Sequence, residues 1–285
     1  MLPWHIVDDV ILRALKEDAH YLDLSCEYLF APAQRSRAYL LANAAGVLCG
    51  MDIFCRVFTL LDASCEFAPQ GRDGGRFAAG DVLLEFEGPT AVLLQGERTA
   101  LNLLQHLCGA ATATARVVKA LEGTGAHVSD TRKTLPGLRA LQKYAVACGG
   151  GRSHRFNLSD GVMLKDNHID ACGSIASAIS SVRAKIGHMV KIEVETRNLD
   201  EVKQALAAGA DVIMLDNMPL DEMREAVAYV RAHETFRVPL EASGDITPEN
   251  AREIALTGVD ILSLGTLTHS VKAMNISMRM GAPPR

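Results

Sequence analysis

Charged and hydrogen-bonding residues recur directly after short apolar runs in the second half of the chain. The polar ends of these runs are Asp130 with Arg132–Lys133, Lys165 to His168, Glu195, Asp216–Asn217, Ser243–Gly244 and Gly265–Thr266. The carboxyl ends of parallel strands converge on one mouth, where reactive groups collect. One such residue would only mark where a buried strand reaches the surface, whereas a series in register favours a single site.

The charges at these ends sort into two groups. The cations are Arg132, Lys133, His154, Arg155 and Lys165, and the carboxylates are Glu195 and Asp216. Guanidinium groups suit carboxylate and phosphate, and lysines add point charge, so the cations predict a dianionic or more highly charged substrate. The carboxylates can hold Mg²⁺, ribose hydroxyls or a developing positive charge on a sugar carbon. A structural ion-pair network is the alternative that these residues leave open.

Two pairs of small residues near the end of the chain, Ser243–Gly244 and Gly265–Thr266, are candidates for a phosphate site. Small residues between a strand and the next segment let backbone N–H groups approach a phosphate, although each pair alone could equally be a turn. His154 follows three glycines at 149–151, which disfavour a helix, so we expect it on a mobile or tightly bent segment in contact with ligand. For His168 and His269 a structural role is equally expected.

Alternating short strands and amphipathic helices must position these groups. We expect strands at 127–130, 162–165, 190–195, 212–216, 238–242 and 261–264. Asn198 is expected to cap one helix, and Thr247–Pro248 to open another that Gly258 closes. This spacing is typical of βα units, which wind into a parallel sheet or barrel.

The first roughly 105 residues have a different pattern, with two helical segments and strand-like runs such as 82–86. They predict an α+β layer domain. From Glu97 a helical pattern continues to about Leu121 and could bridge two domains.

Composition excludes several classes of function. A net charge of −5 without long runs of one sign predicts no nucleic-acid stripe and no polybasic membrane patch. No apolar run has the length of a membrane span, and the residues after Met1 do not resemble a signal peptide, so we expect a cytoplasmic location.

The seven cysteines lack a C-x-x-C pair, so we expect buried, reduced thiols rather than disulfides or a zinc cage. A nucleophilic role for Cys148 is possible in principle, but no base relay stands nearby in the sequence.

Several ordered motifs resemble the quinolinate phosphoribosyltransferase family. They are 96–102 (GERTALN), 131–139 (TRKTLPGLR), 143–146 (KYAV), 149–155 (GGGRSHR), 165–169 (KDNHI), 192–195 (IEVE), 215–217 (LDN), 241–244 (EASG) and 265–269 (GTLTH), and they span essentially the whole chain.

This resemblance implies an α/β fold, with an N-terminal α/β sandwich domain joined to an incomplete α/β barrel of the type II phosphoribosyltransferases. The sandwich is expected at 1–108, completed by 273–285, and the barrel at 109–272. The family also implies a homodimer in which Arg98 reaches the neighbouring active site, with a hexamer of dimers left open.

The implied reaction joins quinolinate to phosphoribosyl pyrophosphate and releases pyrophosphate and CO₂, giving nicotinate mononucleotide for NAD biosynthesis. Carried over by position, Arg98, Arg132, His154, Arg155 and Lys165 bind quinolinate, with Lys133 nearby. Ser243, Gly244 and Gly265 hold the 5′-phosphate. Glu195 and Asp216 face the ribose and the Mg²⁺ cofactor, and the catalytic set is Lys133, Lys165, Glu195 and Asp216.

Three positions depart from the family pattern. Leu135 replaces a frequent threonine, Leu22 a common glycine, and Asp245 a usual glycine beside the phosphate site, where a carboxylate would repel the ligand unless it points away or is paired. The rival readings are the molybdenum-transport-associated relative, a nicotinate or nicotinamide phosphoribosyltransferase, and a non-enzymatic sensor of phosphorylated metabolites.

Overall fold

The computed structural model describes residues 2–19 and 21–283. The chain forms two compact units. The first comprises residues 1–115, 134–150 and 266–285, and the second comprises residues 116–133 and 151–265. Residues 284–285 of the expected C-terminal completion lie outside the described part.

An antiparallel sheet organises the first unit, with strand order β12 (Ile276–Met280), β1 (Arg35–Ala42), β5 (Val82–Pro89) and β3 (Glu66–Pro69). The strand from the C-terminal tail therefore pairs with the first strand of the chain. A second, two-stranded sheet joins β2 (Gly46–Val47) to β4 (Arg76–Phe77). Three helices precede α4, namely α1 (Trp4–Asp18), α2 (Leu24–Leu29) and α3 (Met51–Leu61), whereas two helical segments were predicted.

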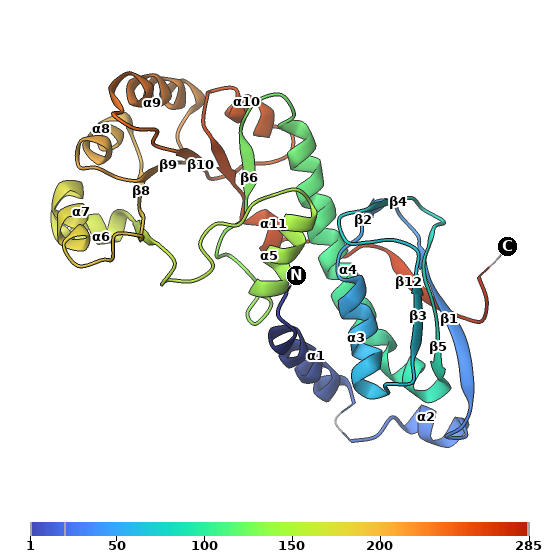
Figure 1. Ribbon diagram of the computed structural model, residues 1–285. Helices are drawn as coiled ribbons and strands as arrows, with labels where there is room; N and C mark the ends of the chain where they lie inside the picture. Colours follow the sequence, from blue (N-terminus) through green and yellow to red (C-terminus); the bar gives the residue numbers. More distant parts are fainter. Residues whose placement is uncertain (1, 20, 284–285) are drawn as a thin grey trace. The chain divides into compact units, whose positions relative to one another are not determined.

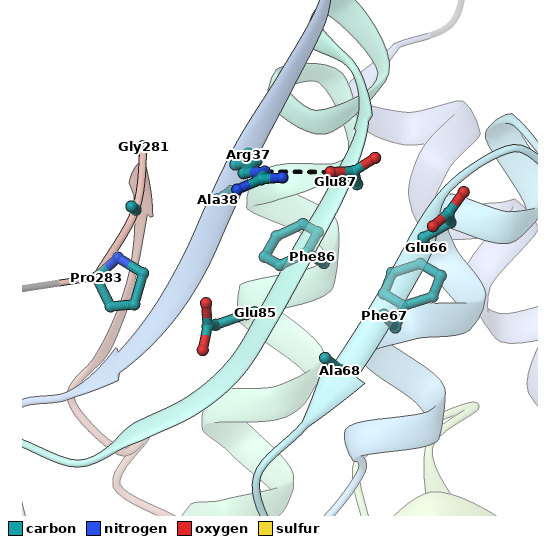
Figure 2. Close-up of a pocket in the computed structure, with 11 residues that line it drawn as sticks. Arg37, Ala38, Glu66, Phe67, Ala68, Glu85, Phe86, Glu87, Gly281 and Pro283 are labelled. Atoms are coloured by element: carbon teal, nitrogen blue, oxygen red, sulfur yellow. Dashed lines mark hydrogen bonds and ion pairs between the residues drawn. The ribbon is translucent and has the colours of Figure 1, made fainter.

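Helices α3 and α4 cover one face of the four-stranded sheet (Figure 1). Phe54 and Phe58 of α3 pack there against Phe86 of β5, with ring centroids 5.7 and 5.3 Å from it. The other face has a shallow cavity of about 270 Å³ beside charged side chains (Figure 2). Arg37 pairs there with Glu87 at 3.2 Å.

Helix α4 (Thr90–Ala120) is 31 residues long and begins seven residues before the predicted start at Glu97. Gly96 lies inside this helix without interrupting it, and a Cβ there would lie 2.7 Å from the ring of Phe58. The absence of a side chain thus serves close packing rather than a break in the helix.

Six parallel strands form the sheet of the second unit, in the order β6 (His127–Ser129), β11 (Ile261–Ser263), β10 (Leu240–Ser243), β9 (Val212–Asp216), β8 (Ile192–Thr196) and β7 (Val162–Leu164). All six predicted strands are confirmed, with ends that move by no more than two residues. The outer edge of β6 forms a single parallel bridge between Ser129 and Arg152. Strands β6 and β7 are not paired to each other, so the sheet is an incomplete barrel.

Side chains alternate along these strands. In β8, Ile192 and Val194 lie on one face, and Glu193 and Glu195 lie on the other. Helices α6 (Asp166–Cys172), α7 (Ile175–Arg183), α8 (Leu199–Ala207), α9 (Leu220–His233) and α10 (Ala251–Ala255) follow the strands along the chain. The apolar positions pack toward these helices, which leaves the alternate positions for the barrel interior.

Of the two helix starts predicted from capping residues, one is confirmed and the other is wrong. The side chain of Asn198 accepts a hydrogen bond from the Glu201 amide at 2.9 Å and caps α8 as predicted. Thr247–Pro248 does not open α10, which begins at Ala251. Thr247 and Asn250 instead bond to each other across a turn, because their short polar side chains compete for the backbone groups of the first helical turn.

The two compact units divide the chain differently from the predicted boundary at residue 108. Helices α5 (Arg139–Cys148) and α11 (Thr266–His269) group with the first unit, although both were placed in the barrel by sequence. None of the helices in the described part is long and apolar enough to cross a membrane.

Candidate active site

A cavity of about 500 Å³ lies at the carboxyl ends of the strands of the second unit. It gathers polar groups from all six strands and the segments that follow them. Its lining comprises Thr131, Arg132, Lys133, His154, Arg155, Met163, Lys165, Glu195, Met214, Asp216, Asn217, Glu241, Ser243, Gly244, Asp245 and Ser263. The polar groups at the predicted strand ends therefore meet at one cavity.

The cationic wall of the cavity combines Arg132, Lys133, Arg155 and Lys165. Arg155 uses Nη1 to bond the Gly161 carbonyl at 2.8 Å, which holds its guanidinium group at the edge of the cavity. Burial, followed by repulsion from Arg132, lowers the pKa of Arg155. Two guanidinium groups held together in this way provide a strong attraction for an anion.

Lys165 and Glu195 face each other across two adjacent strands. Lys165 Nζ lies 2.6 Å from Glu195 Oε2, with the lysine half exposed and the carboxylate mostly buried. This pair is one element of the ion-pair alternative that the sequence left open. Because three further cations line the cavity, the pair does not neutralise the whole wall.

Below the cationic wall, His154 lies between two buried carboxylates. Its Nε2 is 2.9 Å from Glu193 Oε2 and 3.6 Å from Glu241 Oε1. The other ring nitrogen, Nδ1, accepts a hydrogen bond from the Arg155 amide at 2.7 Å. Since Nδ1 is an acceptor, the ring proton belongs on Nε2, where it can be donated to Glu193.

A fully buried carboxylate fixes the segment that carries this histidine. Asp130, at the end of β6, accepts hydrogen bonds from Ser153 Oγ at 3.0 Å and from the His154 amide at 2.9 Å. Hydrogen bonds to a charged acceptor are the stronger class, so the segment after the three glycines is held in place rather than mobile.

Glu241 is almost completely excluded from water, and its environment opposes ionisation. Burial is the largest cause and the neighbouring Glu193 the second, and together they raise the pKa of Glu241 to about 7, with His154 acting in the opposite direction. One oxygen of Glu193 and one of Glu241 also have no hydrogen-bond donor within the described part of the chain. The floor of the cavity therefore stores a proton near neutral pH and has unused acceptor capacity.

The opposite side of the cavity contains a strained backbone. Asn217 and Asp245 have positive φ angles of 51° and 46°, and Gly244 between β10 and Asp245 has φ 102°. A Cβ at Gly244 would overlap the amide side chain of Asn217. Asn217 Nδ2 in turn donates to Asp216 at 3.1 Å, so these residues orient one another. Such strain collects at functional sites.

Four of the sequence candidates lie outside this cavity lining. Gly265 follows β11 but is not among the lining residues, and Arg98 is exposed on α4 in the first unit. His168 accepts a hydrogen bond from the Lys165 amide at 3.0 Å, which gives it a capping role in α6. His269 is exposed in α11 and lies 2.7 Å from Ser270 Oγ.

The expectation for the thiols is only partly correct. Cys26, Cys49, Cys65 and Cys108 are buried, but Cys55 and Cys148 are half-buried and Cys172 is exposed; none is in a disulfide. Cys172 is exposed because it ends the short helix α6, which buries only Ile169.

Glu193 and Glu241 were not among the sequence candidates. The signal was available, because each stands two residues before a predicted site residue, Glu195 and Ser243, on the same strand. Residues two apart on a strand share a face, so both had to point into the barrel. The same rule places Met163 and Met214 in the cavity lining.

Comparison with known proteins identifies the family of the chain. The chain matches the model of the N-terminal domain of quinolinate phosphoribosyl transferase over residues 23–108 and that of the C-terminal domain over residues 110–279. The chain belongs to the quinolinate phosphoribosyltransferase family.

Members of this family resemble the chain along nearly its full length. A probable nicotinate-nucleotide pyrophosphorylase (carboxylating) of Bacillus subtilis is 46% identical, with 92% of this chain and 89% of that protein covered. The human protein of the same name is 37% identical, with 94% and 89% covered. The crystal structure of NadC from Streptococcus pyogenes has a TM-score of 0.93 at 44% identity, with 98% and 97% covered.

The raised pKa of Glu241 predicts a pH-dependent effect of the Glu241→Gln substitution. An acid with an ordinary pKa of 4.5 in the unfolded chain and about 7 in the folded chain destabilises the fold progressively as pH rises between these values. This corresponds to about 3 kcal/mol in the free energy of unfolding. We expect the substitution to stabilise the protein by about 2–3 kcal/mol at pH 8 and to have little effect near pH 4.5.

Urea unfolding at both pH values measures this difference. The matched control is Glu225→Gln, because Glu225 is exposed on α9 of the same unit. Equal effects of Glu241→Gln at the two pH values would contradict the burial of a neutral carboxyl group.

Proposed function

We propose that the cavity of the second unit catalyses decarboxylating transfer of a phosphoribosyl group from phosphoribosyl pyrophosphate to quinolinate. The observation that carries the proposal is the convergence of Arg132, Lys133, Arg155 and Lys165 opposite Glu195 and Asp216 in one cavity. A dicarboxylate and a pyrophosphate require the cations, and a sugar carbon that becomes positive requires the carboxylates. The products are nicotinate mononucleotide, pyrophosphate and CO₂.

Quinolinate binds at the cationic wall in this proposal. Arg132 and Arg155 bind its carboxylates with Lys165, and Lys133 adds charge nearby. His154 contacts quinolinate at the same end, while Glu193 accepts its Nε2 proton and Asp130 fixes the segment that carries it. Positioning by fixed groups replaces a covalent role for the protein.

Phosphoribosyl pyrophosphate binds at the opposite side, with its 5′-phosphate at Ser243, Gly244 and Gly265. The quinolinate nitrogen attacks the anomeric carbon as pyrophosphate leaves, and Glu195 and Asp216 stabilise the oxocarbenium-like sugar. The new pyridinium nitrogen then accepts the electrons released when the adjacent carboxylate leaves as CO₂. Asp245 lines the cavity near the phosphate residues, so the phosphate end is the less favourable of the two electrostatically.

The donor set fits a magnesium ion. Glu195 and Asp216 offer hard carboxylate oxygens at the ends of neighbouring strands, and Mg²⁺ typically binds one or two carboxylates together with substrate phosphates. The ion would supply charge neutralisation for the pyrophosphate. The ion pair with Lys165 keeps the Glu195 carboxylate at the cavity.

The decisive test is the fate of quinolinate with phosphoribosyl pyrophosphate and Mg²⁺. We expect loss of quinolinate and release of nicotinate mononucleotide, pyrophosphate and CO₂ in equal amounts. Chromatography and capture of ¹⁴CO₂ measure these products. Nicotinate and nicotinamide as acceptors are the controls. Turnover of either at a comparable rate, or no turnover of quinolinate by folded protein, would favour the other phosphoribosyltransferases or the molybdenum-associated relative.

Replacement of Arg155 should separate the two substrates. We expect Arg155→Ala to raise the KM for quinolinate about 10- to 100-fold, because a charged hydrogen bond contributes about 1.5–3 kcal/mol. The KM for phosphoribosyl pyrophosphate should change little in the same steady-state assay.

The control for this variant is Arg197→Ala, in the same unit, where Arg197 is exposed and paired with Glu201 at 2.7 Å. If the KM for phosphoribosyl pyrophosphate rose as much as that for quinolinate, Arg155 would belong to the pyrophosphate end instead.

Arg98 supports the proposal that the active site is shared between two copies of the chain. It is exposed in the first unit, whereas the other proposed quinolinate ligands line a cavity made by the second unit alone. We propose a homodimer, possible also within a hexamer of dimers, in which Arg98 completes the neighbouring site. The unpaired thiols of the chain fit a reducing compartment, and we place the reaction in the cytoplasm.

Mixed dimers test the shared site. We expect Arg98→Ala and Lys165→Ala each to be nearly inactive alone, and their mixed dimer to recover about a quarter to a half of the native activity, since one of its two sites is intact. Purification through two different tags followed by the quinolinate assay measures the recovery. Pure mixed dimers that stay inactive would place Arg98 in the site of its own chain.

A further inference from the structure

Three chemically reactive groups gather within the first unit. Cys49, Asp73 and Cys148 each place a side-chain atom within 4.8 Å of the others. Cys49 precedes α3, and Cys148 is the last residue of α5, 99 positions further along the chain (148 − 49 = 99). No role in the proposed reaction involves this cluster, which we call the thiol cluster.

The carboxylate of the thiol cluster already has a structural task. Asp73 accepts hydrogen bonds from the amides of Gly50 and Met51, at 2.8 and 3.1 Å, and thereby satisfies the start of α3. It also accepts a hydrogen bond from the Tyr144 hydroxyl at 2.8 Å. With its two oxygens engaged by three donors, Asp73 is poorly suited to serve as a metal ligand.

The two thiols differ in the way that a reactive pair requires. Cys148 is half-buried and Cys49 is fully buried behind it. A hydrogen bond from Cys49 lowers the pKa of Cys148 and outweighs the effect of burial. The same hydrogen bond and burial raise the pKa of Cys49. The more accessible sulfur is thus the better thiolate, and a protonated thiol lies beside it.

Cys108 lies close to Cys49 but is committed to the backbone. Its sulfur accepts from the Cys49 amide at 3.3 Å and donates to the Cys49 carbonyl at 3.5 Å. Burial raises its pKa to about 12. Cys108 is therefore a neutral packing group at physiological pH.

We propose that Cys148 and Cys49 form a reversible oxidation site, in which a small hydroperoxide converts the pair to a disulfide. The Cys148 thiolate attacks a peroxide oxygen, the O–O bond breaks, and the leaving hydroxide takes a proton to become water. The resulting sulfenic acid is attacked by the Cys49 sulfur, whose proton leaves with the second hydroxide as water. Two thiols lose two protons and two electrons, and one hydrogen peroxide is reduced to two water molecules.

A disulfide requires the two sulfurs to approach to a bonded distance of about 2.05 Å, and the side-chain atoms of the thiol cluster already lie within 4.8 Å of one another. Gly50 follows Cys49 with φ 93°, and Gly149 and Gly150 follow Cys148, the second with φ 89°. Cys148 also lies at the end of its helix, where no further helical turn restrains it. The bond would join two segments that are distant in sequence but already adjacent.

The test begins with the native full-length protein. After treatment with hydrogen peroxide and alkylation, we expect the count of free thiols to fall from seven to five and mass spectrometry to find a Cys49–Cys148 cross-linked peptide. Dithiothreitol should restore the count. Because the bond closes a loop of about 100 residues, the thermal midpoint should rise by roughly 5 °C or more on oxidation.

Two variants distinguish this pair from general oxidation. In Cys49→Ser we expect Cys148 to accumulate as a sulfenic acid that a cyclic 1,3-diketone traps, whereas Cys172→Ser should leave the cross-link unchanged. Cys172 is the more exposed thiol and is the matched control. Oxidation that follows exposure alone, at Cys172 without a cross-link, would overturn the proposal. Retention of one Zn²⁺ per chain that depends on Cys148, again without a cross-link, would assign the thiol cluster to metal binding instead.

Discussion

Burying a carboxylate costs free energy unless a partner compensates it, and the interior of the second unit buries Glu193 and Glu241 beside the same histidine. Both side chains must point into the barrel, because the neighbouring residues on each strand point the other way and pack toward the helices. His154 can offset this cost only if its ring is held between the two acids. The hydrogen bonds that Asp130 accepts from Ser153 and the His154 amide therefore couple the fold of β6 to the chemistry of the cavity.

The same constraint organises charge through the depth of the cavity. Carboxylates lie at its floor, and a Lys165–Glu195 pair stands at the level of the strand ends. The guanidinium groups of Arg132 and Arg155 line the cationic wall. An anionic ligand would bind the cations without breaking the contact between His154 and Glu193 at the floor of the cavity. The His154 ring, which donates to Glu193, and the neighbouring cations are therefore arranged before the ligand binds.

Backbone strain on the phosphate side shows a different means of preparation. Asn217 and Asp245 hold positive φ angles that most side chains avoid, and Gly244 is the residue type that leaves space for the amide of Asn217. Asn217 then bonds Asp216, so a turn that is unfavourable in isolation fixes a carboxylate at the end of β9. Asp245 itself holds this conformation, and aspartate is among the few residues other than glycine that tolerate it.

Most features of the second unit follow from local patterns in the sequence. Apolar runs with polar ends located the six strands to within two residues, because each strand buries alternate apolar side chains, as Ile192 and Val194 do in β8. Asn198 predicted the start of α8 for a local reason too, because its side chain caps the first turn. Charge and spacing also located the cavity lining, with Arg132, Arg155, Lys165, Glu195 and Asp216 all found there.

Only the tertiary structure decided which groups touch. That Glu193 and Glu241 share His154, and that Cys49 lies beside Cys148, depends on contacts between segments that are distant in the sequence. Local propensity carries no information about such pairs. The grouping of α5 and α11 with the first unit is decided in the same way, since a helix joins the unit that buries its apolar face and not the one nearest in sequence.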